Sequence, residues 1–350
     1  MKKNKIIVII SIFLAIAAMM LVVTQSDKTF KRSLSDFEIE DTAAVTKIFM
    51  ADKNNHTVEL TRQPSGNWMV NNTWKASKNS IDLILQTMHN LTVKEPVPRP
   101  AYNNVIRDLA VNSVKVEIYQ KVYRINLFNR IRWFPHEKLT KVYYIGGATQ
   151  SNRGNFSLME GSSVPFITWL PGFRGFVSPR FQPIPKYWRD YTVFKKNLPE
   201  IATVLVEFPT KKNESFQMTN QGNILISLST YPEKQVIPDF DTLAALNFLT
   251  AFRNLNFEAI LDDFNPHRKD SILSSLPLII ITLTDTSGST TLMKAFFKEG
   301  DGQTDINGDV IPYDLDRLYA LVNNGEDFVL IQYFNFDRVL RPRSFFLLER

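Results

Sequence analysis

The sequence predicts an α+β protein in which an N-terminal transmembrane helix precedes two tandem copies of a mainly antiparallel β-sheet unit with one main helix each. Apolar residues at 81, 84, 85, 88, 91 and 93 recur at 245, 248, 249, 252, 255 and 257, a shift of 164. The β-rich run 114–119 recurs at 279–284, a shift of 165. "GFRGFVSPRF" is echoed by "FNFDRVLRPRSFF", with the two Pro-Arg pairs (Pro179-Arg180 and Pro342-Arg343) 163 residues apart. These similar offsets predict one copy at 36–181, a linker at 182–191, a second copy at 192–346 and a tail at 347–350.

The predicted transmembrane helix lies at 6–23, after the Lys-rich tip 1–5. Eighteen residues, interrupted only by Ser11, give a helix of about 27 Å, close to the thickness of a bilayer's hydrocarbon core. The lysines favour a cytoplasmic N-terminus, so residues after the juxtamembrane linker 24–35 are expected on the extracytoplasmic side of the membrane. A cleaved signal peptide ending near Ala15-Ile16-Ala17 is the alternative. The chain has no cysteine, which excludes disulfides and an acylated cysteine anchor.

The elements of the first copy follow in order. Strands are expected at 45–51, 57–62 and 67–71, joined by the turn-forming segments "DKNNH" and "QPSGN". Apolar spacings of three and four at 81–93 predict an amphipathic helix, and 105–110 a short second helix. A long hairpin is expected around 123–141, and Gly146-Gly147 is interpreted as a turn between strands. In the second copy, alignment with the first predicts a strand at Leu318 to Val322 and a turn at 323–325.

The segments "DTAAVTKIFMADKNNHTVELTRQPSGNWMVN", "LTVKEPV" and "VYYIGGATQSNRGNFSLMEGSSVPFITWLPGF" together resemble the bacterial family called domain of unknown function 4340. The resemblance covers most of the first copy and, more loosely, the second. It implies a membrane-anchored extracytoplasmic protein, in some bacteria encoded beside an ABC-type export or gliding apparatus. The family offers no catalytic residues to transfer.

Chemistry-bearing motifs are few. Outside residues 1–26, 38 basic residues against 35 acidic ones leave a charge too small to indicate a nucleic-acid surface. The four histidines show no ligand spacing, so no metal is expected, and no cofactor motif or catalytic group is found. The segment 301–314 has an alternative interpretation as a calcium loop, but Asp314 replaces the usual Glu, and a polar connecting loop is the preferred interpretation.

Two aromatic and basic segments are candidate contacts with a partner or a membrane. In the first, Arg130 and Arg132 flank Trp133 and Phe134, and Trp beside Arg suits a membrane interface or an acidic partner. The second contains Arg174 and Arg180. Internal packing is the preferred interpretation of both segments: a hairpin folded over its own sheet for the first, and packing between the copies for the second.

The sequence therefore predicts a non-enzymatic binding or scaffold protein of the cell envelope. Its expected partners are the membrane, through residues 6–23, and an envelope or transporter protein, with no nucleic acid. Two alternatives remain: an accessory subunit of an ABC-type exporter, and an envelope hydrolase with carboxylates at the junction of the copies.

Overall fold

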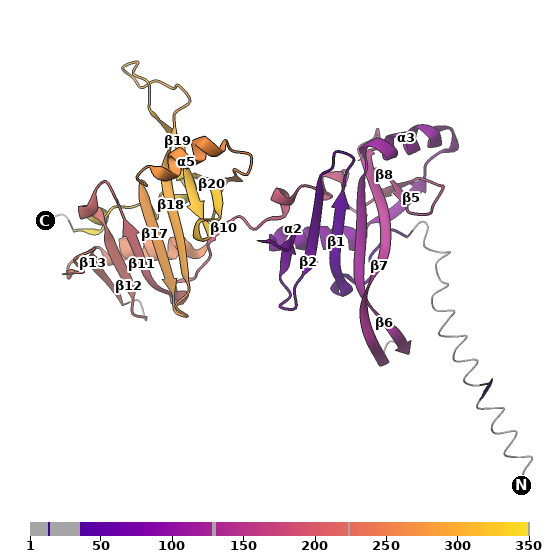
Figure 1. Cartoon of the computed structure of the whole chain (residues 1–350), viewed down its shortest axis with the longest axis horizontal. Helices are drawn as coiled ribbons and strands as arrows, with labels where there is room; N and C mark the ends of the chain where they lie inside the picture. The colour runs from indigo at the N-terminus through magenta and orange to yellow at the C-terminus, as the bar shows by residue number, and fades with distance from the viewer. Residues whose placement is uncertain (1–12, 15–35, 128–130, 223–224, 349–350) are drawn as a thin grey trace, which may run out of the picture. The chain divides into compact units, whose positions relative to one another are not determined.

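The computed structural model describes residues 13–14, 36–127, 131–222 and 225–348 (Figure 1). The chain forms two compact units, unit 1 at residues 1–190 and unit 2 at 191–350. Residues 182–190, predicted as most of a linker, are grouped with unit 1 because Trp188 is buried in its core and the Trp188 carbonyl accepts a hydrogen bond from the Ser77 backbone N–H at 2.7 Å.

Unit 1 contains a nine-stranded antiparallel sheet in the order β4-β3-β2-β1-β6-β7-β8-β9-β5. Its strands are β1 (Val45–Ala51), β2 (Thr57–Arg62), β3 (Trp68–Val70), β4 (Trp74–Lys75), β5 (Thr92–Pro96), β6 (Val114–Leu127), β7 (Ile131–Ala148), β8 (Asn155–Met159) and β9 (Phe166–Trp169). Two helices accompany them, α2 (Lys78–Asn90) and α3 (Tyr102–Asn112). The predicted opening strands and both predicted helices of this copy are confirmed.

Helix α2 covers one face of this sheet. Ser77 caps its N-terminus by accepting a hydrogen bond from the Ser80 backbone N–H. The apolar stripe seen in the sequence is buried, because Ile81, Ile84 and Met88 pack with inward-facing residues of β1, β2 and β6. Helix α3 lies at one end of the sheet, over β7 and β8 (Figure 1).

Unit 2 repeats this topology. Its nine-stranded sheet has the order β14-β13-β12-β11-β17-β18-β19-β20-β16, strand for strand equivalent to unit 1. The strands are β11 (Ile201–Glu207), β12 (Phe216–Asn220), β13 (Ile226–Thr230), β14 (Val236–Ile237), β16 (Ala259–Ile260), β17 (Ile279–Asp285), β18 (Thr290–Glu299), β19 (Tyr313–Val322) and β20 (Asp327–Gln332). The helices are α4 (Thr242–Thr250), α5 (Pro266–Ser274) and α6 (Tyr333–Phe336), and a separate ladder joins β10 (Thr192–Phe194) to β15 (Leu255–Asn256). The tandem arrangement predicted from the repeat is confirmed.

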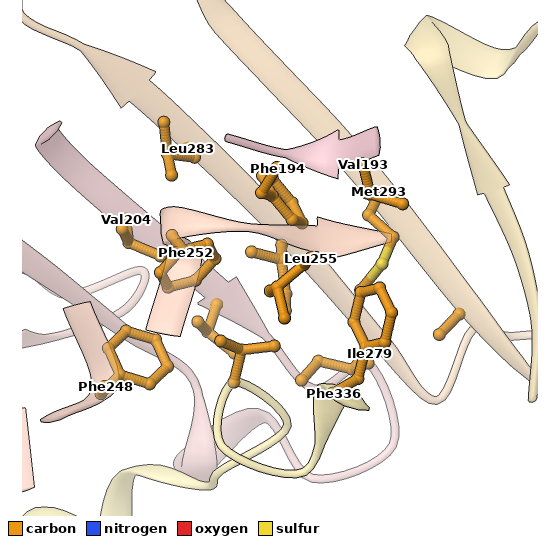
Figure 2. Close-up of a cluster of buried hydrophobic side chains, with 14 of the residues drawn as sticks. Val193, Phe194, Val204, Phe248, Phe252, Leu255, Ile279, Leu283, Met293 and Phe336 are labelled. Carbon is orange, nitrogen blue, oxygen red and sulfur yellow. The ribbon is translucent and has the colours of Figure 1, made fainter. Parts of the chain in front are cut away.

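Phenylalanine rings pack among aliphatic side chains in the core of unit 2 (Figure 2). Phe252 lies between Phe194 and Phe248, with ring centroids 5.1 and 5.3 Å away and near-perpendicular planes. Phe346, from the recurring segment at the chain's end, packs on Phe248 at 5.4 Å and is fully buried. Its equivalent in unit 1, Phe181, is also fully buried. The echo in the sequence therefore marks the segment that returns to close each core.

Two details depart from the sequence prediction. Gly146 and Gly147 lie within β7, so the prediction of a turn there is wrong. A Cβ on Gly146 would collide with the Leu109 side chain of α3, so close packing of helix on strand is what favours glycine at this position. Helix α5 was not predicted, whereas the strand at Leu318 to Val322 is confirmed as part of β19.

The predicted membrane anchor falls almost wholly on residues outside the described ranges, which include only Phe13 and Leu14 of it. No helix within the described ranges has the length and apolar character needed to cross a membrane.

Candidate functional site: a projecting β-ribbon

The outer parts of β6 and β7 form a two-stranded ribbon beyond the sheet, here called the arm (residues 121–127 and 131–138). Strand β1 pairs with β6 only as far as Gln120, and β8 first pairs with β7 at Tyr143. Beyond these points β6 and β7 pair only with each other, from Lys121↔Glu137 to Leu127↔Ile131. Figure 1 shows this end of β6 and β7 extending past the neighbouring strands. The preferred interpretation of this segment, a hairpin folded over its own sheet, is therefore wrong.

A register shift marks the base of the arm. The β6–β7 ladder shifts between Ile118 and Tyr119, and such bulges bend a ribbon and increase its twist. The Thr140 hydroxyl donates to the Ile118 carbonyl at 3.1 Å and lies 2.7 Å from the Gln120 side-chain oxygen. These bonds satisfy polar groups where the ladder is interrupted, which fixes the direction in which the arm leaves the sheet.

Strand register gives the arm one apolar face. Residues opposite each other in an antiparallel ladder project from the same side, and the structure pairs Tyr123 with Pro135 and Ile125 with Trp133. Trp133 remains 58% exposed and Pro135 is also exposed. No second layer within the described structure buries this face, unlike the inward face of the sheet.

Positive charge gathers along the same ribbon, mostly on its other face, because Arg124 and Arg132 alternate with the residues of the apolar face. Among its described side chains the arm has four basic residues and one acidic residue: Lys121, Arg124, Arg132, Lys138 and Glu137. The Arg132 guanidinium lies 5.7 Å from the Tyr123 ring centroid, at the outer range of a cation–π contact. Phe134, with a φ of 55°, is 65% exposed. The arm thus combines exposed aromatic rings with an excess of cations.

The single carboxylate of the arm is engaged at its base. Glu137 accepts a hydrogen bond from the Thr46 hydroxyl at 2.6 Å and lies 3.7 Å from the Lys47 ammonium. Lys47 in turn lies 4.0 Å from the Tyr119 ring centroid. Glu137 is therefore directed toward β1, at the base of the arm.

A polar network continues from this base onto the open face of the sheet. Burial acts to raise the pKa of Glu117, but hydrogen bonds from Lys115 at 2.7 Å and Tyr119 at 2.9 Å outweigh it and leave that pKa below its ordinary value. The same bond to Glu117, followed by burial, raises the pKa of Tyr119. The network holds a charged carboxylate beside a neutral phenol, which stabilises the strand pairing beneath the arm.

The residues predicted from sequence divide between two places. Arg132, Trp133 and Phe134 lie in the arm, and Arg130 lies outside the described residues. Arg174 is exposed in the loop after β9. The Arg180 side chain lies 4.7 Å from the Phe173 ring centroid and donates to the Thr87 hydroxyl of α2 at 2.9 Å. Arg180 therefore contacts a helix of its own unit and is not brought together with the arm.

Tyr123 and Ile125 lie within the predicted hairpin but were not predicted as contact residues. The sequence pattern could have identified them, because alternation along the two strands of a hairpin places Tyr123 opposite Pro135 and Ile125 opposite Trp133.

Unit 2 has its own extension, the loop between β18 and β19, which Figure 1 shows projecting beyond the sheet. Its Asp305 carboxylate accepts backbone N–H bonds from Asn307 at 2.8 Å and Asp309 at 3.0 Å. At its base, Lys298 pairs with Asp314 at 2.7 Å. Among the described residues no three acidic or histidine side chains converge as metal ligands. The preferred interpretation of 301–314 as a connecting loop accounts for these contacts.

The chain was compared with protein-family models, curated proteins and solved structures, and none of them matches it.

Proposed function

We propose that this chain is a membrane-anchored extracytoplasmic protein of the bacterial cell envelope that acts by binding or scaffolding an envelope component, with the arm as its contact surface. The anchor is the apolar segment 6–23, and the N-terminal lysines orient the two units outward. The resemblance to domain of unknown function 4340 supports the same location.

One observation carries the proposal: the arm is a two-stranded ribbon that exposes Trp133 and Phe134. A hairpin standing alone is marginally stable in water, since it has no sheet or helix to cover its apolar side. Exposed apolar surface rimmed by charge is typical of contact sites. A binding role explains why the chain extends this hairpin far past the strands that support it.

The location is tested by fractionation of bacterial cells. The full chain is expected in the membrane pellet after alkaline extraction, and a variant lacking residues 6–23 is expected to leave it. External protease added to spheroplasts should then digest units 1 and 2. Units protected from that protease would contradict the proposed topology.

The contact is tested by photo-crosslinking in living cells, with a photoreactive amino acid at Trp133. The matched control carries the same amino acid at Val236, a 70% exposed residue of β14 in unit 2. Intact-mass analysis of the purified chain should show a discrete adduct at Trp133 and none at Val236. Equal labelling at the two positions would refute a contact role for the arm.

A further inference from the structure

The surface that the arm contacts can be inferred from the residues of the arm and from the place where the chain enters unit 1. We propose that the arm lies on the surface of an anionic phospholipid bilayer, with Trp133 at the headgroup level and the arginines against lipid phosphates. This inference rests on the membrane anchoring proposed above and specifies what the arm contacts.

The composition of the arm favours a lipid interface. Trp and Tyr concentrate at the boundary of a bilayer because their rings are apolar and their N–H or O–H groups stay hydrated. The Tyr123–Pro135 and Ile125–Trp133 pairs present such side chains on one face. Lys121 is exposed on the same face, and Arg124 and Arg132 are exposed on the other face of the ribbon. Their long side chains can extend past the ribbon to the same headgroup layer, and cations near an anionic leaflet are attracted to it. A ribbon can rest on this boundary without crossing it, as amphipathic helices do.

The entry point of the chain places the arm near the membrane. Asp36, the first residue of the described range 36–127, pairs with Lys141 of β7 at 3.1 Å. The Lys141 ammonium also donates to the Asp36 carbonyl at 2.8 Å, and Lys141 lies only three residues beyond the arm. Close by, the Gln120 side chain donates to the Asp41 carbonyl at 3.0 Å. The predicted juxtamembrane linker therefore joins unit 1 beside the base of the arm.

The length of the predicted juxtamembrane linker limits how far unit 1 can lie from the bilayer. Residues 24–35 span at most about 40 Å when fully extended, and seven residues of β6 give the arm a length of about 20 Å. A unit tethered at the base of its arm can thus place the whole arm on the bilayer without straining the linker.

The test uses the full chain in lipid nanodiscs. Because the chain has no cysteine, Phe134→Cys creates one labelling site, to which an environment-sensitive fluorophore is attached. Val236→Cys in unit 2 is the matched label control. Discs of phosphatidylcholine alone are compared with discs of phosphatidylcholine and phosphatidylglycerol in equal parts. The label at 134 is expected to shift to shorter wavelength only in the anionic discs, and to revert when salt is raised from about 0.05 to about 0.5 M.

Charge removal makes the test quantitative. Replacing Arg124 and Arg132 by Gln should lower the bound-to-free ratio of the arm about 25-fold, since each cation near an anionic surface contributes about fivefold. The matched variant removes two exposed arginines elsewhere in unit 1, Arg107→Gln with Arg153→Gln, and should leave the ratio unchanged. Arg107 belongs to α3, at the other end of β7 from the arm (Figure 1).

Each outcome decides the inference. No shift in anionic discs, or an equal shift in both kinds of disc, overturns it, as does an equal effect of the two arginine pairs. A chain that does not enter nanodiscs at all contradicts the proposed anchor instead. In that case, co-sedimentation with vesicles of the same two compositions still measures the arm, and lack of preference for the anionic vesicles overturns the inference.

Discussion

Replacing Tyr143 by Phe is expected to stabilise unit 1. The Tyr143 ring is fully buried between Phe37 and Phe181, at centroid distances of 5.6 and 6.3 Å. Its hydroxyl has no hydrogen-bond partner among the described groups. The equivalent residue in unit 2 is Met293, which faces Ile281 as Tyr143 faces Val116. The fold therefore accepts an apolar side chain at this place.

The size of the expected change in the free energy of unfolding follows from the unpaired Tyr143 hydroxyl. A buried polar group without a partner costs about 1–3 kcal/mol, and part of that is offset by the packing contacts that the oxygen makes. We expect Tyr143→Phe to raise the free energy of unfolding of unit 1 by about 1 kcal/mol, which corresponds to about 2–4 °C in Tm for a unit of this size. Calorimetry of the detergent-solubilised chain measures it.

The pH dependence of the stability of the same variant provides a second test. Burial raises the pKa of Tyr143 far above its ordinary value, so the folded state keeps its proton when the unfolded chain loses it. The free energy of unfolding of the parent is therefore unaffected by this proton below about pH 10 and falls as pH rises further, because only the unfolded chain releases it. The advantage of Tyr143→Phe over the parent should therefore grow above pH 10 by about 1.4 kcal/mol per pH unit.

Tyr144→Phe is the matched control. The neighbouring Tyr144 hydroxyl donates to Glu160 at 3.0 Å at the exposed surface, so its removal should change stability at neutral pH by less than about 0.5 kcal/mol. If Tyr143→Phe instead destabilises unit 1 by more than about 1 kcal/mol, and its difference from the parent does not change with pH, the phenol has a partner and the reasoning fails.

Two further variants test the packing and the electrostatics of the units. Gly146→Ala should cost about 1–3 kcal/mol in urea unfolding, because its Cβ meets the Leu109 side chain, whereas Gly147→Ala has open space around its Cβ; equal effects would contradict this. In unit 2, the pKa of Asp285 lies well below its ordinary value, chiefly through its bond from Lys196 at 2.6 Å. A lowered carboxyl pKa stabilises the fold above about pH 4 and loses that effect as pH falls. The Tm deficit of Asp285→Asn should therefore narrow below about pH 4, and a deficit that stays constant down to about pH 2 would disprove the ionic contribution.

Local pattern predicted much of the fold. The strands at 45–51 and 57–62 match the structure because each is a short β-rich run ended by turn-forming residues. The stripe beginning at Ile81 identified α2 because one face of that helix is buried. Comparison of the copies then predicted the strand at Leu318 to Val322, which is part of β19. The equivalent segment of unit 1 is followed by a turn in which Gly161 has a positive φ.

The remaining differences arise from contacts that sequence pattern does not encode. The composition of Gly146-Gly147 is typical of a turn. In the structure, however, Gly146 is required because the Leu109 side chain of α3 lies too close for a Cβ. Helix α5 has few apolar residues and no buried ones, so its periodicity is weak. At the arm, the aromatic and basic residues were visible, but its projection depends on where β1 and β8 stop pairing.

The identical strand order of the two units has a consequence for synthesis. Each nine-stranded sheet uses strands of its own unit alone, so unit 1 can complete its pairing once residue 190 has emerged, before unit 2 exists. Domains that fold in this order as they are made have less opportunity to exchange equivalent strands, the usual failure of repeated domains. Translation from the N-terminus therefore protects a chain whose two halves share one topology.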